Sequence, residues 1–404
     1  MVYGCQLLKN FYPTTFILNP YATLNLELMI LVTTFQLFLI VFIVTYLSIN
    51  MIYLIRIYPV KEELVAYPYI SVCVPARNEE RDVKKCVESL LNQDYPNFEV
   101  IVVDDNSNDN TPKIVSSMAE QYSNLIFIAG AQLASGWTGK PYALHQAYQR
   151  SRGQYLLFTD ADLTYQSHAL KTAVHTMVCK DLDLLTLMPA VIFGSFWERV
   201  VQPVIFGFIA SLTNFRKVNS ESHQSAMGFG AFLFFKKEAY QKIGGHLSVA
   251  NEVLEDIMIA KKAKLNGLSV LVADGKNLFS IRMYHSMREI WMGWRKNIFL
   301  AMKSSVFRAS YYMSMVLCFL LTPYIVVMCN LWIGAESVWV GISLLGLALT
   351  LATGLGLCHE LGLERKNVFL FPLGAIMMAM IMFSSMLQTL WLRRTEWRGR
   401  IYEQ

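Results

Sequence analysis

Residues 155–163 read Tyr-Leu-Leu-Phe-Thr-Asp-Ala-Asp-Leu, and this stretch decides the fold. Its continuous apolar run is typical of a strand that is buried on both faces. The run ends in two carboxylates, Asp160 and Asp162, and ligands in open α/β sheets bind at the carboxyl ends of the strands. Carboxylates there suit a hard divalent cation that also binds phosphate oxygens. A lone Asp-X-Asp is more often a helix-capping turn, so the surrounding residues must decide between the two interpretations.

The stretch lies within residues 66–275, where short apolar runs alternate with amphipathic segments in the pattern of βα units. We predict strands at 69–75, 98–103 and 125–129, a fourth strand from 155, and helices at 77–93, from 111, and at 141–152. Polar residues follow the first, second and fourth strands, namely Asn78, Glu79, Asp104, Asp105, Asp160 and Asp162. The carboxyl ends of parallel strands share one edge, so we expect these side chains in one crevice. Their negative charges would need a cation there.

The composition indicates an integral membrane protein with one soluble domain. The 404 residues are 54% hydrophobic and 16% charged, with net charge +5 and mean hydropathy +0.36, whereas soluble proteins carry about 25% charged residues. Apolar segments at 26–55, 311–333, 338–358 and 368–392 approach or exceed the roughly 20 residues that span a bilayer. Membrane-flanking Lys and Arg explain the mild basic balance better than nucleic acid does. The seven cysteines form no C-x-x-C pair, which argues against a zinc site.

The positive charges next to the apolar segments predict the topology. Arg56 and Lys61 place the soluble domain in the cytoplasm. Three further crossings would leave the C-terminus outside, as Arg365 and Lys366 suggest, but the arginines of residues 393–400 favour a cytoplasmic tail. We prefer the cytoplasmic tail. It requires one segment, either the one interrupted by Pro323 or the one starting at Pro372, to be re-entrant or interfacial.

Five parts are expected along the chain. Residues 1–60 form an N-terminal segment and transmembrane anchor, 61–285 the catalytic domain, 311–392 the C-terminal transmembrane segments and 393–404 a basic tail. Residues 286–310 interleave cations with aromatic and apolar side chains at helical spacing. That pattern describes an amphipathic helix on an anionic membrane surface.

Three motifs together resemble the nucleotide-sugar half of a family 2 glycosyltransferase with a GT-A fold: Pro75-Ala76-Arg77-Asn78-Glu79, Val103-Asp104-Asp105-Asn106-Ser107 and Thr159-Asp160-Ala161-Asp162. The stretches 136–144, 228–232 and 255–257 extend the resemblance. Residues 279–284, 293–297 and 396–402 resemble the membrane-anchored members that glycosylate lipids, the hopanoid-associated, diaponeurosporenoate (carotenoid) and ceramide-type enzymes. The implied fold is a cytoplasmic α/β domain of GT-A type, with a Rossmann-like mixed sheet between N-terminal and C-terminal transmembrane helices.

The resemblance implies roles for residues on the donor side. Asn78, Glu79 and the paired Asp104 and Asp105 hold uracil and ribose, next to Pro75. Asp162 of the DxD motif ligates Mn2+ or Mg2+ at the diphosphate, with Asp160 near the ribose or in the outer coordination shell. Lys140 contacts the nucleotide or is a solvated surface lysine. It is not a P-loop lysine, because Pro141 follows where Ser or Thr is required.

The resemblance also implies roles for residues on the acceptor side. Asp256 is the general base of an inverting transfer and Glu255 supports it; the alternative is that these acids only begin a helix. Gly228 and Gly230 form a loop where backbone approaches the ligand, or an ordinary turn. Trp294, Arg295 and Lys296 face the acceptor and the diphosphate, or only the membrane. The polymer synthases of the family have Gln-x-x-Arg-Trp near this position, so its absence favours single transfer.

We therefore predict a multi-pass enzyme of the cell membrane that moves sugar from a UDP-sugar to the hydroxyl or carboxylate of an apolar lipid at the cytoplasmic face. Its acceptor would be a carotenoid, hopanoid, ceramide-like lipid or glycerolipid, and nucleic acid is not expected as a partner. Polyprenyl-phosphate glycosyl transfer and polysaccharide synthesis within the same family are the alternatives. A transporter is disfavoured because charged residues avoid the apolar segments. A binding subunit without activity would be expected to lack Asp162 or Asp256, and both are present.

Overall fold

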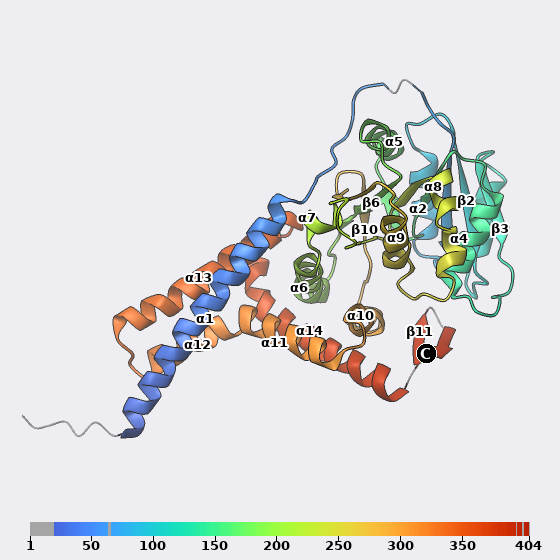
Figure 1. The fold of residues 1–404 in the computed structure, drawn as a ribbon. Helices are drawn as coiled ribbons and strands as arrows, with labels where there is room; N and C mark the ends of the chain where they lie inside the picture. Colours follow the sequence, from blue (N-terminus) through green and yellow to red (C-terminus); the bar gives the residue numbers. More distant parts are fainter. Residues whose placement is uncertain (1–19, 64–65, 393, 398–399, 404) are drawn as a thin grey trace, which may run out of the picture.

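The computed structural model describes residues 20–63, 66–392, 394–397 and 400–403. A mixed α/β domain lies at one end of the molecule and long apolar helices extend away from it (Figure 1). Residues 1–19 of the expected N-terminal segment lie outside the described residues. So do Arg393, Arg398, Gly399 and Gln404 of the expected basic tail.

The central sheet has seven strands in the order β3-β2-β1-β4-β8-β6-β9. These are β1 (Ile70–Ala76), β2 (Phe98–Asp104), β3 (Leu125–Ala129), β4 (Tyr155–Phe158), β6 (Leu184–Met188), β8 (Leu233–Lys236) and β9 (Val270–Asp274). Strand β1 pairs in parallel with β2 on one side and β4 on the other, and β8 is antiparallel to both β4 and β6. Ala76 lies opposite Asp104 at the end of the β1–β2 pair. The carboxyl ends of the first, second and fourth strands therefore meet at one edge, as predicted.

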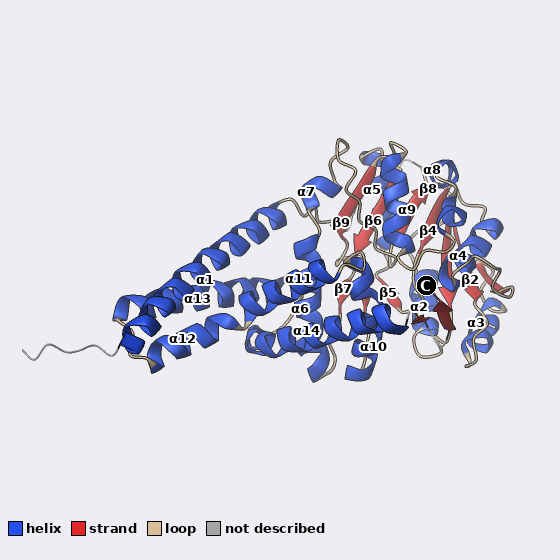
Figure 2. Ribbon diagram, turned by 60° about the horizontal axis from the view of Figure 1, so that its bottom comes forward, coloured by secondary structure: helices blue, strands red, loops and turns tan. Residues whose placement is uncertain are grey.

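Helices cover both faces of this sheet (Figure 2). One face packs against α2 (Val83–Leu91), α3 (Thr111–Ala119) and α5 (Ala169–Cys179), and the other against α4 (Gly139–Arg150), α8 (Lys237–Lys242) and α9 (Glu255–Leu265). Successive side chains of a strand point to opposite faces. Val72 and Val74 accordingly lie in the first core and Cys73 in the second. Both faces are apolar, which explains the continuous apolar runs in the sequence.

A second, three-stranded sheet links the Asp-X-Asp turn to the helices below it. Its strands are β5 (Leu163–Tyr165), β10 (Phe279–Ile281) and β7 (Ala190–Val191). Strand β10 is antiparallel to β5, with Ile281 opposite Leu163. Since Leu163 directly follows Asp162, the chain that leaves β10 at Arg282 runs beside the Asp-X-Asp turn. Two short helices, α7 (Phe215–Val218) and the 3-10 helix η1 (Gly245–Val249), complete the domain.

Helices α6 (Phe196–Leu212), α10 (Met287–Ala301) and α14 (Phe371–Leu387) pack on one another through apolar side chains and form a helical layer. Ser195 caps α6, and its hydroxyl accepts from the backbone N–H of Glu198, a residue paired with Arg282 at 2.9 Å. Helix α14 approaches α6 closely: a Cβ added to Gly374 would lie 2.1 Å from the carbonyl oxygen of Val200. The Ser385 hydroxyl also joins α14 to the backbone of α10.

The remaining helices are α1 (Pro20–Ile52), α11 (Val306–Leu320), α12 (Thr322–Trp332) and α13 (Ser337–Glu360). Within the described residues, three segments are long and apolar enough to cross a membrane: 27–52, 337–360 and 365–390. The pair α11–α12, bent by 52°, would be a fourth if it acts as one span. Helices α1 and α13 lie side by side and end near the domain (Figures 1 and 2). Polar bonds join α1 to α12, from Gln36 Nε2 to Thr322 Oγ1 at 2.7 Å and from Asn330 Nδ2 to Thr33 Oγ1 at 3.0 Å.

Two sequence predictions differ from the structure. The helix expected at 77–93 begins at Val83, because Asn78 is left-handed (φ 54°) and the backbone N–H groups of Asn78 and Glu79 bond to Ser107 and Thr111. The segment expected at 311–333 is two helices, with the break at Leu321 before Pro323.

The last apolar segment, which includes η2 (Arg365–Leu370), is more buried than the others: 44% of it is buried within the protein, against 17% and 22% for the other two candidate spans. The chain then forms the π-helical turn η3 (Gln388–Leu392) and the hairpin β11 (Arg394–Trp397) and β12 (Arg400–Glu403).

Candidate active site

The loops after β1 and β2 are joined by hydrogen bonds into one wall at the carboxyl ends of these strands. The backbone N–H of Asn78 donates to Ser107 Oγ at 2.9 Å, and Asn78 Oδ1 accepts from the N–H of Asn108 at 2.8 Å. The N–H of Glu79 donates to Thr111 Oγ1 at 2.8 Å. Asn78 and Asn106 both have a φ of 54°, a region that asparagine tolerates better than most residues. The wall is thus held by side chains that bond to backbone.

The paired aspartates end β2 at the base of this wall. Asp104 is 6% exposed and Asp105 2% exposed. Asp104 Oδ2 accepts from the N–H of Ser107 at 3.2 Å, whereas its buried Oδ1 has no partner among the described residues. The guanidinium of Arg77 donates to the carbonyl oxygens of Asp105 and Asn106 and closes the loop from below. Pro75 is half-buried within β1, opposite Val103.

A hydroxyl pair fixes the Asp-X-Asp turn to the glycine loop 228–231. Thr159 Oγ1 and Tyr165 Oη lie 2.5 Å apart, and both are within hydrogen-bond distance of the carbonyl oxygen of Ala231, at 2.9 and 3.3 Å. Burial raises the pKa of the Tyr165 phenol, so it stays protonated. The carbonyl oxygen of Asp160 accepts from Cys86 Sγ of α2 at 3.5 Å. The two carboxylates are therefore presented from a rigid turn.

Lys140 joins that turn to the start of α9. Its Nζ lies 2.7 Å from Asp160 Oδ1 and 2.9 Å from Glu255 Oε1. Burial would lower the pKa of Lys140, but the carboxylates of Asp160, Glu255 and Asp256 outweigh it and hold the pKa well above its ordinary value. The amine is permanently charged, and one cation faces three acids. Such a cluster attracts a further cation.

Asp256 is held against the glycine loop. Its Oδ2 accepts from the N–H of Gly230 at 2.8 Å, and its Oδ1 from the N–H of Ile257 at 2.8 Å. A close backbone contact requires Gly228, because a Cβ there would lie 2.1 Å from the Asp256 carbonyl oxygen, whereas a Cβ on Gly230 would lie 2.7 Å from Nζ at the end of the flexible Lys140 side chain. Burial and the neighbouring Glu255 carboxylate raise the pKa of Asp256 to about 6, against the opposing effects of Lys140 and the two N–H groups. This carboxyl titrates where a general base would be useful.

The arrangement of these side chains agrees with a comparison of the sequence with known protein families. Residues 71–244 match the profile described as glycosyl transferase family 2. They form a family 2 glycosyl transferase domain.

Relatives and a solved structure extend the match beyond this glycosyl transferase domain. A 4,4'-diaponeurosporenoate glycosyltransferase of Staphylococcus haemolyticus is 28% identical over 64% of this chain and 68% of its own length. That of Staphylococcus aureus is 26% identical over 57% of this chain and 60% of its own length, so the chain spans about three fifths of that relative. The mannosyltransferase PcManGT from Pyrobaculum calidifontis, solved with GDP-Man and Mn2+, superposes with a TM-score of 0.52 at 17% identity. The superposition covers 91% of this chain and 99% of PcManGT, so the fold is of GT-A type.

The carboxylates of the glycosyl transferase domain fit a hard metal ion that takes most of its ligands from the substrate. Within the described part of the chain, no three His, Cys, Asp or Glu side chains are grouped so that they could hold a metal by themselves. Asp160 and Asp162 offer only oxygen, which suits Mg2+ or Mn2+. A Mg2+-like ion is usually bound by one or two carboxylates together with phosphates. The donor set is therefore consistent with the metal expected at this turn.

The predicted acceptor residues Trp294, Arg295 and Lys296 lie on α10, in the helical layer and not in the Lys140 cluster. The Trp294 ring packs against Tyr284 and against Phe206 of α6, with centroids 6.3 and 5.8 Å apart. Trp294 Nε1 and Arg295 Nε are buried without hydrogen-bond partners among the described residues. A helix that only faced the membrane would not bury these groups, so α10 also belongs to the interior of the protein.

Sequence reasoning missed the roles of Arg77 and Tyr165 and the burial of one glutamine. The role of Arg77 in closing the loop after β2 was not predicted, although it lies inside a quoted motif. The role of Tyr165 was not predicted either, although its hydroxyl fixes the Asp-X-Asp turn. Gln202 in α6 is fully buried, and its place as the one polar residue within 200–206 could have drawn attention to it.

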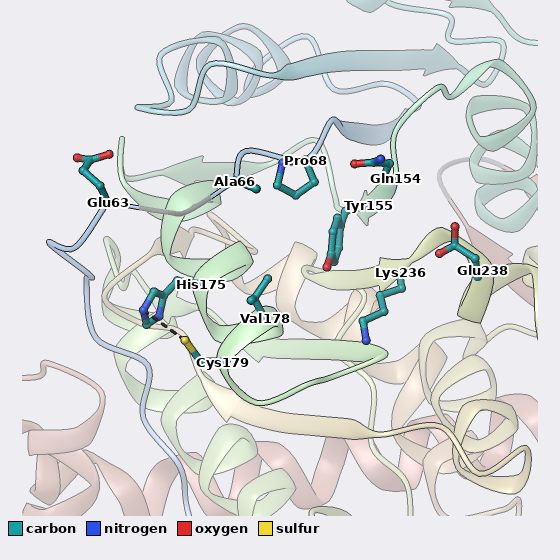
Figure 3. A pocket seen from close by; sticks show the side chains of 10 residues that line it. All are labelled: Glu63, Ala66, Pro68, Gln154, Tyr155, His175, Val178, Cys179, Lys236 and Glu238. Carbon is teal, nitrogen blue, oxygen red and sulfur yellow. Dashed lines mark hydrogen bonds between the residues drawn. The ribbon is translucent and has the colours of Figure 1, made fainter.

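A cavity of about 560 Å³ lies at the opposite edge of the sheet (Figure 3). Tyr155 begins β4 and Lys236 ends the antiparallel β8, and these two paired residues line it. His175 and Cys179 contribute from α5, 3.5 Å apart. Because Asp160 and Asp162 follow the other end of β4, this cavity is separate from the cluster of Lys140, Asp160 and Glu255.

Proposed function

We propose that the chain is an inverting, metal-dependent hexosyltransferase that moves one sugar from a UDP-sugar to a membrane lipid at the cytoplasmic face. The observation that supports this most is the position of Lys140, bonded both to Asp160 of the Asp-X-Asp turn and to Glu255 beside Asp256. A donor diphosphate at the turn and an acceptor hydroxyl at Asp256 would then meet within one small cluster. Such placement of two reactants is a major source of rate enhancement.

The donor would lie along the loops after β1 and β2. Oxygens of Asn78, Glu79, Asp104 and Asp105 accept hydrogen bonds from a base N–H and from ribose hydroxyls. The unpartnered, buried Oδ1 of Asp104 is suited to accept one of them. PcManGT was solved with GDP-Man, a guanosine donor, so donors with either base belong in the assay.

The diphosphate would lie at the Asp-X-Asp turn, bound through Asp162 with Asp160 beside it. A Mn2+ or Mg2+ ion held there supplies Lewis-acid stabilisation of the charge that grows on the leaving nucleotide. Lys140 Nζ contacts Asp160 at 2.7 Å, and in the complex a phosphate oxygen of the donor would replace this carboxylate as its partner. The raised pKa of Lys140 keeps the amine charged at any physiological pH. Its position gives the leaving group a second positive charge.

Asp256 would act as the base. In the proposed step the acceptor oxygen attacks the anomeric carbon, the bond from that carbon to the phosphate oxygen breaks, and the acceptor proton passes to Asp256. The N–H groups of Gly230 and Ile257 orient the carboxylate. A pKa of about 6 keeps it ionised at neutral pH while leaving it more basic than an ordinary aspartate.

The acceptor is proposed to be a lipid because the apolar helices adjoin the domain and because the relatives are named for a carotenoid-type acceptor. In the proposed topology α1, the bent pair α11–α12 and α13 cross the membrane. Segment 365–390 would lie at the interface, since it is the most buried of the candidate spans and packs on α6 and α10. This arrangement keeps the C-terminus cytoplasmic. It selects the segment starting at Pro372 as the interfacial one.

The proposal is tested with membranes that contain the chain and labelled UDP-sugars and GDP-sugars, followed by extraction of lipids. The expected result is a labelled lipid from a UDP-sugar, with no product from membranes that contain Asp162→Asn. Release of labelled polymer, or of no lipid product from any donor, would refute it. A polyprenyl phosphate acceptor needs no strong base. A lipid carboxylate needs none either, so transfer that is indifferent to Asp256→Asn favours the polyprenyl phosphate alternative only when the labelled product is not an ester of a lipid carboxylate.

A further inference from the structure

Two of the candidate membrane spans end at one network of charged side chains. Arg56 follows α1 and Glu360 ends α13, and their side chains are 2.7 Å apart. Lys276 Nζ lies 3.0 Å from Glu360 Oε2. Asp274, at the end of β9, lies 3.7 Å from Arg56 and 3.5 Å from Lys276. Two cations thus face two carboxylates, and because these side chains are at most 32% exposed, water screens their attraction less than at an open surface.

Backbone hydrogen bonds fix the same junction between α1 and β9. The N–H of Ile57 donates to the carbonyl oxygen of Asp274 at 2.9 Å, and the N–H of Asp274 donates to that of Ile55 at 2.8 Å. The Asn277 amide also donates to the carbonyl oxygen of Ile57, at 3.2 Å. The chain that leaves α1 is therefore paired with the end of β9 before it continues to β1.

Asn50, in the last turn of α1, joins this helix to the domain a second time. It is 5% exposed, and its Nδ2 donates to two carbonyl oxygens at the C-terminal end of α6, at 3.1 and 2.8 Å. Its Oδ1 accepts from the N–H of Phe215 in α7 at 3.0 Å. Asn219, which follows α7, exchanges two hydrogen bonds with the backbone of Val272 in β9. Both connections from α1 therefore lead to the same strand.

The end of β9 lies on the edge of the sheet that carries the Asp-X-Asp turn. Strands β4, β6 and β9 run in one direction, because β8 is antiparallel to β4 and β6 while β9 is parallel to β6. One row of paired residues crosses these strands at Phe158, Leu233, Thr186 and Val272. Asp160 and Asp274 each come two residues after this row. Since neighbouring strands are about 4.8 Å apart, the charge network lies about 14 Å along the edge from the Asp-X-Asp turn.

We propose that Arg56, Asp274, Lys276 and Glu360 are positioning residues that hold the active-site edge of the domain at a fixed height above the membrane. The proposal rests on the glycosyl transfer proposed above. A lipid whose head leaves the bilayer surface exposes its apolar tail to water, which is unfavourable whether the head is a hydroxyl or a carboxylate. The protein must therefore bring its active site to the lipid head. A misplacement of about 1 Å at the reacting atoms can cost about a hundredfold in rate, so the junction between spans and domain matters for transfer.

Glu360 is the member of the charge network whose loss should open the junction. It bonds to both cations, and it is the member that comes from α13. Glu360→Gln keeps the size of the side chain but leaves Arg56 and Lys276 close together with one carboxylate between them, at 3.7 and 3.5 Å. Like charges repel, so the end of α13 should separate from the domain. The bonds of Asn50 and of the backbone remain, so the fold should be retained.

The test uses Glu360→Gln in the full chain with two acceptors, the lipid in bilayers and a short-chain, water-soluble form of the same lipid. The kcat/KM for the bilayer lipid should fall about tenfold, because the active site no longer has a fixed position over the membrane. Transfer to the soluble form and nucleotide affinity should stay within about twofold of wild type, because neither depends on that position. Arg56→Lys keeps the cation next to Glu360 and should retain most of the transfer to the bilayer lipid.

The matched control is Glu99→Gln, in an ion pair away from the spans. Glu99 lies near the amino end of β2, pairs with Arg152 at 2.7 Å and accepts from the Ser71 hydroxyl at 2.7 Å. Its loss should affect transfer to the bilayer lipid and to the soluble form alike. The proposal is overturned if Glu360→Gln also lowers both transfers equally, or if it leaves both unchanged.

A second measurement does not depend on glycosyl transfer. A fluorophore on the exposed Cys179 of α5, in a chain with Cys5→Ser, reports the distance of the domain from a lipid dye in vesicles of phosphatidylcholine and phosphatidylglycerol. The efficiency of energy transfer should change in Glu360→Gln and stay at the wild-type value in Glu99→Gln. An unchanged efficiency in Glu360→Gln overturns the positioning role. If the wild type glycosylates no lipid, the proposed function fails, while the energy transfer still decides whether the charge network holds the domain in place.

Discussion

The two sides of the Lys140 cluster are built in different ways. On the nucleotide side, short loops after β1 and β2 are held by side chains that bond to backbone, such as Ser107 with Asn78 and Thr111 with Glu79. On the lipid side, helices α6, α10 and α14 pack through apolar contacts and leave Gln202 and Trp294 without polar partners. The proposed nucleotide side is thus held by polar bonds within the protein, whereas the proposed lipid side has buried polar atoms without partners among the described residues. Such a difference would suit an enzyme that always uses the same nucleotide donor but must recognise a particular lipid acceptor.

The largest effect is expected at the Asp-X-Asp turn, on the nucleotide side. Asp162→Asn should lower kcat/KM by about a thousandfold, because a metal-bound diphosphate leaves far more readily than one whose growing charge is not neutralised. In the wild type Mn2+ or Mg2+ should tighten nucleotide binding, and chelation with EDTA should reverse this. The same titrations by calorimetry in Asp162→Asn should show no response to metal. A full metal response in the variant would remove Asp162 from the site.

Lys140 joins the two sides, so its replacement should affect both. Lys140→Met leaves Asp160, Glu255 and Asp256 without their cation, and like charges at this distance repel. We expect kcat/KM to fall about a hundredfold and nucleotide affinity to weaken. Lys140→Arg, which keeps the charge, should recover part of the loss. An effect on nucleotide affinity alone would separate Lys140 from the acceptor side.

The pH dependence should come from the acceptor side. The folded-state pKa of Asp256 is raised to about 6 by burial and by Glu255, so the base becomes protonated as the pH falls through that value. The transfer rate should therefore fall towards tenfold per pH unit below about pH 6. Nucleotide binding should not follow this curve. The measurement is the transfer rate between about pH 5 and about pH 8, a range that extends roughly one unit below and two units above this pKa. A transfer rate that does not change over this range would exclude Asp256 as a titrating base.

The smallest effect concerns the packing of the lipid side. Gly374→Ala forces a Cβ to within 2.1 Å of the Val200 carbonyl oxygen, so α14 must shift away from α6. Overpacking of this kind costs about 1–3 kcal/mol. Gly341→Ala in α13 is the control, because its Cβ would meet nothing within 4 Å. Thermal unfolding should separate the two variants; equal melting temperatures would contradict the close contact between α14 and α6.

The nucleotide side was the easier part to predict from sequence. Its residues follow buried strands directly, so the apolar runs place Asp104 and Asp160 at one sheet edge. The resemblance to the family added Asp256. The start of α2 at Val83 was not predictable, because Asn78 adopts a left-handed conformation fixed by bonds to the next loop. Single-residue patterns do not encode such long-range bonds.

The lipid side was harder to predict for a physical reason. Hydropathy gives apolar segments but not which one packs on the domain, and the close approach at Gly374 depends on the matching surface of α6. The break at Leu321 follows from Pro323, but its bend of 52° depends on helices around it. Gln202 stands out in the sequence as a polar residue in an apolar stretch, but its burial without hydrogen-bond partners among the described residues became visible only in the structure.

The central claim is that donor and acceptor meet at the cluster of Lys140, Asp160, Glu255 and Asp256. Its most direct test measures nucleotide affinity and lipid transfer side by side in Asp256→Asn. The account predicts that transfer to a lipid hydroxyl falls about a thousandfold, within the range for loss of a general base, while nucleotide affinity is retained. Undiminished transfer to a hydroxylated lipid in this variant would contradict it.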